Sequence, residues 1–153
     1  MIFDHPNNDP VLVLTEGQCW KLLEATQHGR LIGSVGERID IFPINIAVQG
    51  GSIVFRTAPG TKLAEVAINE NVLIEADGIL SDQAWSVVVR GTAHMLETSQ
   101  EIAEAETLGL KPWVPGPKEQ FVRVTPQEIS GRHFAFGPYR DRELGEGSEA
   151  GGD

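Results

Sequence analysis

The sequence predicts a mainly β protein, built as a small closed antiparallel barrel with peripheral α-helices. Three observations favour this fold class. Short segments of strand-like composition recur along the chain and are separated by Gly-containing turns. Three segments have helix signals, and they lie between groups of strands. The order of these elements contains too many antiparallel neighbours for a doubly wound parallel sheet.

The composition predicts one soluble globular domain. The chain has 153 residues, of which 41% are hydrophobic and 22% are charged, and no apolar run approaches the roughly 20 residues that a membrane span needs. Its formal net charge is −10, which argues against a general binder of nucleic acid or of anionic membranes, because those partners require a basic surface. An anionic ligand must therefore be held by cations that are gathered locally.

Changes in composition predict the domain boundaries. Residues 1–13 are polar and contain proline, and we expect a terminal arm there. Residues 14–138 form the folded domain, and residues 139–153 form an acidic, Gly-rich tail that we expect to be disordered. The N-terminus lacks the features of a secretory signal and Cys19 is the single cysteine, so we expect a cytoplasmic protein.

Two capping boxes and one Pro-Gly turn predict the helices. In a capping box a Thr is followed three residues later by Gln or Glu, and this pattern occurs at Thr15 and at Thr98. Gly29 occupies the position of a C-terminal glycine cap for the first helix. The predicted helices cover residues 16–27, about two turns after the Pro-Gly turn at 59–60, and residues 98–108.

Seven segments have the composition of strands, and the first three read as an antiparallel meander. A Pro-rich loop over residues 111–117 and a short capped turn over residues 125–129 separate the later strands. The predicted strands cover residues 30–35, 39–48, 52–57, 72–76, 84–96, 121–124 and 132–136.

Two of these strands carry unusual residues. Pro43 removes one donor from the hydrogen-bond ladder, so the second strand lies at an edge, is bulged, or faces a ligand at that point. The run from Val87 to Val89 is too apolar for a strand face left in water, and we expect it to be buried on both sides.

The stretch from Phe55 to Lys62 is predicted to cradle an anion. It places Arg56, Thr57, Thr61 and Lys62 around a Pro-Gly turn between a strand and a helix. A helix start presents unpaired N–H groups and the positive end of the helix dipole, which favour a phosphate, and the two cations add charge-assisted hydrogen bonds. The alternative is an ordinary connection between a strand and a helix, with solvated cations.

Two further segments could hold a flat heteroaromatic ring. Pro43, Ile44 and Asn45 form an interrupted strand with free backbone groups and an amide that could meet the polar edge of the ring. Trp85 and Ser86 offer an aromatic face and a hydroxyl. The alternatives are an edge-strand proline, a surface asparagine and a core tryptophan.

Other kinds of site are not indicated. The four histidines are scattered and form no pair with metal-ligand spacing, so we expect no metal site. Neither a nucleophile elbow nor a dinucleotide-binding glycine motif occurs. The sequence therefore identifies no catalytic residue.

Five segments, taken in order and spacing, resemble a known family. The chain is similar to the pyridoxamine 5′-phosphate oxidase-like, FMN-binding split-barrel proteins, in their nitroimidazole-resistance and general stress branch, over about residues 12 to 136. The segments are Gly29-Arg30-Leu31, Pro43-Ile44-Asn45, residues 55–62, residues 85–91 and Ile129-Ser130-Gly131-Arg132.

The resemblance implies a six-stranded antiparallel split barrel and a homodimer with FMN in grooves at the subunit interface. It implies phosphate and ribityl contacts from Arg56, Thr57, Thr61 and Lys62. The same resemblance implies further cofactor contacts from Pro43, Ile44, Asn45, Trp85, Ser86 and Arg132.

Two classes of function follow. The first is an FMN-dependent oxidoreductase, in which the flavin carries out the redox step and the protein supplies binding and orientation. Within the same fold, a deazaflavin cofactor is the alternative ligand. The second class is a flavin-binding or stress-related protein without catalytic activity.

Overall fold

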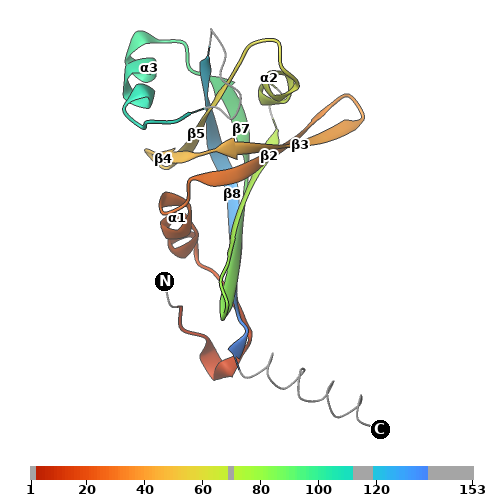
Figure 1. The fold of residues 1–153 in the computed structure, drawn as a ribbon, viewed down its shortest axis with the longest axis vertical. Coiled ribbons are helices and arrows are strands. Elements are labelled where there is room, and N and C mark those ends of the chain that lie inside the picture. Colours follow the sequence, from red (N-terminus) through yellow and green to blue (C-terminus); the bar gives the residue numbers. More distant parts are fainter. Residues whose placement is uncertain (1–2, 69–70, 112–118, 138–153) are drawn as a thin grey trace.

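The protein is described by a computed structural model that covers residues 3–68, 71–111 and 119–137 (Figure 1). Within these residues, strands predominate over helices. The helical elements are the 3₁₀ turn η1 (Pro6–Asn8), α1 (Glu16–Glu24), α2 (Lys62–Ala67) and α3 (Ser99–Glu106). The strands are β1 (Val11–Val13), β2 (His28–Val35), β3 (Arg38–Asn45), β4 (Ala47–Gln49), β5 (Ser52–Thr57), β6 (Val72–Ile79), β7 (Gln83–Met95) and β8 (Gln120–Ala135).

The described strands form one antiparallel sheet that curls on itself. Its order is β3-β2-β6-β7-β8-β5-β4, and β1 pairs with the free part of β8. β3 and β4 lie at opposite ends of this order although Ile46 alone separates them in the chain, so the two ends of the sheet must meet at this residue. The predicted split-barrel fold is confirmed.

The interior of the barrel is apolar. Figure 1 shows the long paired strands β7 and β8 running the length of the molecule, with α1 beside them and α2 and α3 at their upper end. Leu31, Phe55, Ile74 and Val122 are among the fully buried residues of the main core. A second, smaller core forms under α3, where Ala105 packs with residues of β5 and β8.

The first predicted helix begins where expected but ends early. Thr15 and Gln18 form the complete capping box, with the Gln18 N–H donating to Thr15 Oγ1 at 3.2 Å. The helix stops at Glu24, so the prediction of a cap at Gly29 is wrong. Gly29 lies in β2, where an added Cβ would stand 2.9 Å from the carbonyl oxygen of Glu75. The glycine thus permits close strand pairing.

Two strand predictions need correction. The predicted strand over 39–48 is broken at Ile46, so its first part pairs with β2 and its second part with β5. The predicted turn over 125–129 is wrong, because β8 continues through it. Gln127 is the extra residue of a β-bulge between the pairs Gly91–Pro126 and Arg90–Glu128, and β8 stays paired with β7 on both sides of it. The break at Ile46 adds one strand to the seven predicted, the merging of 121–124 and 132–136 into β8 removes one, and β1 adds one, so the described residues form eight strands where the resemblance implied six.

The two strands with unusual residues are β3, which contains Pro43, and β7, which contains Val87 to Val89. β3 is at the end of the sheet order, so the edge position predicted from Pro43 is confirmed. Val87 and Val89 are fully buried, whereas Val88 is half-buried on the other face. Burial of this run on both sides is therefore incomplete in the single chain. Most of the Pro-rich loop predicted over 111–117 and the predicted tail over 139–153 lie outside the described residues.

The segment before α1 lies along the barrel. β1 pairs with β8, and the Leu14 N–H donates to the Gly131 carbonyl at 2.9 Å. None of the helices in the described ranges is long and apolar enough to cross a membrane.

We predict opposite effects of Gly→Ala substitutions at two positions. An added Cβ at Gly91 would lie 2.4 Å from the Thr125 carbonyl oxygen, so Gly91→Ala should lower the free energy of unfolding by roughly 1 to 3 kcal/mol. Gly17 is exposed in α1 with open space around it, so Gly17→Ala should raise this free energy by about 0.5 to 1 kcal/mol. Urea unfolding measures both, and equal effects would contradict the described packing.

Candidate functional site

Strand alternation divides the predicted site residues between two faces of the sheet. Neighbouring residues in a strand point to opposite faces, and residues directly paired across strands share a face. Ile44, Thr57 and Trp85 lie on the inner side; Ile44 and Thr57 are buried there and Trp85 packs against the main core. Pro43, Asn45, Ser86 and Arg132 lie on the outer face. The structure therefore brings the second group, but not the first, to a common surface.

Two rows of paired residues define this outer face. One row runs from Pro43 through Arg30 and Glu75 to Val88 and Ser130. The next row runs from Asp77 through Ser86 and Arg132 to Val13. The rows lie side by side, so Pro43, Ser86 and Arg132 share one continuous surface although they are far apart in the sequence.

A polar groove opens beside the edge strand β3. Its larger part has a volume of about 410 Å³ and lies between the end of α1, the β3–β4 junction and residues 108–111. A smaller hollow of about 200 Å³ adjoins it at His28 and includes Arg30, Pro43 and Asp77. The larger volume is within the range of small-molecule pockets in proteins. We call the two hollows together the β3 groove.

Asn45 organises one wall of the β3 groove. Its Nδ2 donates to the Lys111 carbonyl at 2.8 Å, and its Oδ1 lies 3.0 Å from His28 Nδ1. This amide ties β3 to the segment that follows α3. The predicted surface asparagine is thus fixed by two hydrogen bonds at the groove.

Arg30 and Asp77 line the smaller hollow, and Glu75 pairs with Arg30 beside it. Arg30 Nη1 lies 2.7 Å from Glu75 Oε2 and 3.0 Å from Asp77 Oδ2. The hydrogen bond that Arg30 donates to Glu75, and then the charge of Asp77, raise the pKa of the Arg30 guanidinium. Burial, with a contribution from Asp77, raises the pKa of Glu75 above its usual range. The hollow therefore has both signs of charge at one wall.

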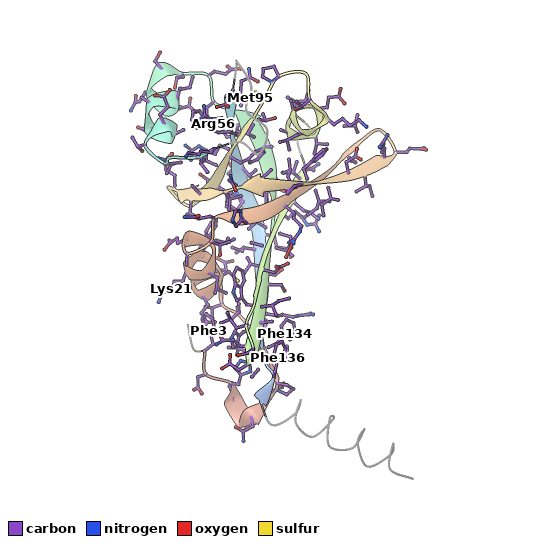
Figure 2. All side chains as sticks on the ribbon, in the orientation of Figure 1. Phe3, Lys21, Arg56, Met95, Phe134 and Phe136 are labelled. Atoms are coloured by element: carbon purple, nitrogen blue, oxygen red, sulfur yellow. The ribbon has the colours of Figure 1, made fainter. Side chains whose placement is uncertain are left out.

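Arg56 lies on the α3 side of β5 and is held by residues on both sides of segment 112–118 (Figure 2). Its Nη2 lies 2.6 Å from Glu119 Oε2, and its Nη1 donates to the Leu110 carbonyl at 3.0 Å. The guanidinium also stacks 4.6 Å above the Phe121 ring. Its Nε is buried and has no hydrogen-bond partner within the described residues. Among the described residues, this buried donor therefore lacks an acceptor.

The rest of the predicted cradle lies at the start of α2. Thr61 is the N-cap, and its Oγ1 accepts from the Ala64 N–H at 3.1 Å. Thr57 faces this turn, with its Oγ1 3.5 Å from that of Thr61. Lys62 is exposed at the first position of the helix. Because Arg56 and Thr57 are neighbours in β5, they point to opposite sides, and the cradle is split between two faces.

Trp85 lies opposite a buried histidine. It pairs in register with His133, whose Nε2 is 2.8 Å from Gln83 Oε1 and whose Nδ1 is 2.6 Å from His5 Nε2. Burial, and then the neighbouring His5, lower the pKa of His133 below its ordinary value of 6.5; Asp82 opposes this effect. The histidine is therefore favoured in its neutral form.

Sequence reasoning missed the partners of the predicted residues. His28, Lys111 and Glu119 all contact Asn45 or Arg56, yet none lies in a recognisable motif. Arg30 could have been found, because it alternates with His28 along a strand whose other face is apolar. Among the residues that the structure covers, no group of three or more His, Cys, Asp or Glu is arranged to hold a metal ion.

The curled antiparallel sheet and the groove beside its edge strand define a split-barrel protein. The chain belongs to the pyridoxamine 5′-phosphate oxidase family, whose model matches residues 15–133.

Proteins from actinobacteria are similar to this chain. A solved structure from Corynebacterium glutamicum, described as a candidate pyridoxamine 5′-phosphate oxidase, is 42% identical, covers 85% of this chain and 98% of its own, and has a TM-score of 0.76. The FAD-binding protein from Mycobacterium smegmatis is 44% identical, with 81% and 98% coverage and a TM-score of 0.72. An uncharacterised Mycobacterium tuberculosis protein is 45% identical over 95 residues, which are 62% of this chain and 86% of that protein.

We predict that acid destabilises the fold through His133. A lowered folded-state pKa means that the folded chain binds fewer protons than the unfolded chain as the pH falls below about 6.5, so stability declines there. His133→Gln should flatten the dependence of unfolding free energy on pH between about pH 7.5 and about pH 5. The exposed His94 on β7 supplies the control, since His94→Gln should keep the wild-type slope. An unchanged slope in His133→Gln would count against this assignment.

Proposed function

We propose that the protein is an FMN-dependent oxidoreductase, with the flavin in the β3 groove and on the outer face beside it. Asn45, which lines the groove, and Arg56, which hydrogen-bonds to a lining residue, carry this proposal. Both side chains reach the same short segment, since Asn45 bonds to the Lys111 carbonyl and Arg56 to the Leu110 carbonyl. Family membership and the 44% identity to an FAD-binding protein support a flavin as the ligand.

The donor set of the site fits a flavin. Asn45 and Arg30 place polar side chains at the groove, and a flavin carries ring carbonyls, ribityl hydroxyls and phosphate oxygens that could meet them. The exposed Lys62 at the start of α2 is suited to a phosphate. Pro43 at the edge strand leaves no N–H at that position, so a flat ring can approach its backbone without burying a donor.

The roles of the chain follow from these positions. Bound flavin would supply hydride or electron transfer, the step for which the sequence identifies no side chain. Lys62, Thr61 and Arg56 would anchor the cofactor, while Asn45 and Pro43 would orient its ring edge. Ser86 and Arg132, which lie on the outer face, would complete the site. The proposal includes a cytoplasmic location, which the free, buried Cys19 supports.

Titration with three cofactors tests the ligand. Added FMN should bind and change its fluorescence, with FAD and a deazaflavin cofactor compared under the same conditions. Lys62→Gln should weaken FMN binding about tenfold or more, because a charge-assisted contact to the phosphate is lost. Lys21→Gln, on α1, is the matched control and should bind like the wild type. Tighter binding of the deazaflavin would contradict FMN as the cofactor. A chain that binds none of the three cofactors would refute the proposal.

We also propose that two copies of the chain pair through the outer face. This face exposes apolar side chains that a single chain leaves in water, including Val13 at 72% and Ile39 at 74% exposure. A hollow of about 330 Å³ lies beside Val13, bounded by Ser86, Val88 and Arg132. A second copy would cover these side chains and contribute residues to the flavin site. In this arrangement Ser86 and Arg132 of one copy would contact the flavin of the other, whereas neither residue lines the β3 groove of its own chain.

The mass in solution tests the pairing. Light scattering should give the mass of two chains, and Val13→Glu should shift the population toward one chain, because a charge would be buried at the interface. Ile68 is similarly exposed, at 66%, and is the C-cap residue of α2, away from the outer face. Ile68→Glu should therefore keep the wild-type mass. A single-chain mass for the wild type would contradict the pairing.

A further inference from the structure

Two histidines join the segment before β1 to the far end of the barrel. We call residues 3–9 the η1 segment, and Figure 1 shows its turn next to the end of β8. His5 Nε2 lies 2.6 Å from His133 Nδ1, and the two ring centroids are 4.9 Å apart. The Phe3 ring meets His133 edge-on at 5.0 Å. His133 is 4% exposed, so this contact between two titratable rings is shielded from water.

The four ring nitrogens limit how many protons the pair can hold. His5 Nδ1 lies 2.7 Å from the Asp9 carbonyl, so this nitrogen carries a proton. One proton lies between His5 Nε2 and His133 Nδ1, because one nitrogen must accept what the other donates. His133 Nε2 is 2.8 Å from the Gln83 amide, which can present its oxygen or, after a flip, its NH₂ group. The intact contact therefore holds two or three protons, and a fourth breaks it.

The surroundings of the pair disfavour a second charge. Burial, and then His5 and the N-terminus, lower the pKa of His133, whereas Asp82 raises it. The acids of the η1 segment itself are Asp4 and Asp9, and Asp9 Oδ1 accepts from a backbone N–H of β1 at 2.9 Å. Neutral residues contact His133 or pair with it across the strands: Phe3, Leu12, Gln83 and Trp85. Two charged rings would face each other where burial already disfavours charge.

The η1 turn depends on these ring contacts for its position. None of its residues from Pro6 to Asn8 is buried. Asn7 and Asn8 have φ angles of 57° and 55°, a conformation that L-residues rarely adopt. Segments with few buried contacts open at a low free-energy cost while the rest of a protein stays folded. Loss of the His5–His133 contact should therefore open the η1 segment and leave the barrel intact.

We propose that the His5–His133 contact is a pH switch, which holds the η1 segment against the barrel at neutral pH and releases it when both rings are protonated. The sign follows from linkage. The closed segment binds fewer protons than the open one, so its stability is fully present above the ordinary histidine pKa of about 6.5 and is lost as the pH falls below it. Release uncovers His133 and the end of the β7–β8 pairing. The switch does not depend on the proposed flavin.

NMR of the full chain tests the switch between about pH 7.5 and about pH 4.5. The pair should titrate in two steps, the second at least about one unit below the ordinary value, which is a tenfold loss of proton affinity. Over the second step, ring contacts among Phe3, His5 and His133 should disappear. Backbone order parameters of residues 3–9 should fall from about 0.85 to below about 0.6, while those of β7 and β8 stay near the higher value.

His5→Phe keeps an aromatic ring in the η1 segment but removes one titrating partner. In this variant His133 should titrate in one step, and the order of residues 3–9 should no longer depend on pH. The exposed His94 on β7 supplies the control, since His94→Gln should keep both steps. Residues 3–9 that stay ordered in the wild type after both rings are protonated would overturn the proposal. A pH-dependent release that persists in His5→Phe would also overturn it.

Discussion

The pairing of β7 with β8 is the interaction on which the rest of the structure depends. It joins Gln83–Met95 to Gln120–Ala135 over almost the full length of both strands. Every other strand joins the sheet through the outer edge of β7 or through the outer edge of β8. A bulge at Gln127, next to Pro126, shifts the register by one residue, and the pairing continues on both sides of it. Because alternation along these strands is fixed by the pairing, the ladder decides which residues face the core and which face outward.

This constraint also explains how the groove arises. The sheet curls until β3 and β4 meet at Ile46, which leaves Pro43 and Asn45 at an open edge. The segment after α3 passes beside this edge and is fixed there through its backbone carbonyls. The groove is thus formed by a junction in the sheet and a loop that is remote in sequence. The groove is polar in part because Asn45, which hydrogen-bonds to the loop, lines it.

Much of the fold could be predicted from local patterns. The helix starts at the Thr15 capping box, at the N-cap Thr98 and at Thr61 are governed by nearby residues, so they were identified. Gly29 and residues 125–129 were misinterpreted, since glycine and proline signals are local while the reasons for these residues lie in neighbouring strands. The site was found in part: Asn45 lines the groove, and Arg56 hydrogen-bonds to Leu110 of its lining. Their partners Lys111 and Glu119 depend on tertiary contacts that no local pattern reveals.

The chain carries a net charge of −10, so recognition of a phosphorylated ligand depends on where its cations stand free of carboxylates. Arg30 and Arg56 are both paired with acids, whereas Lys62 is exposed. The central claim is that these residues hold a flavin. The most direct measurement is the visible absorption spectrum of the purified chain before and after FMN is added and free ligand removed. We predict the bands of an oxidised, protein-bound flavin in a stoichiometric amount; a chain that stays colourless after this treatment would contradict the account.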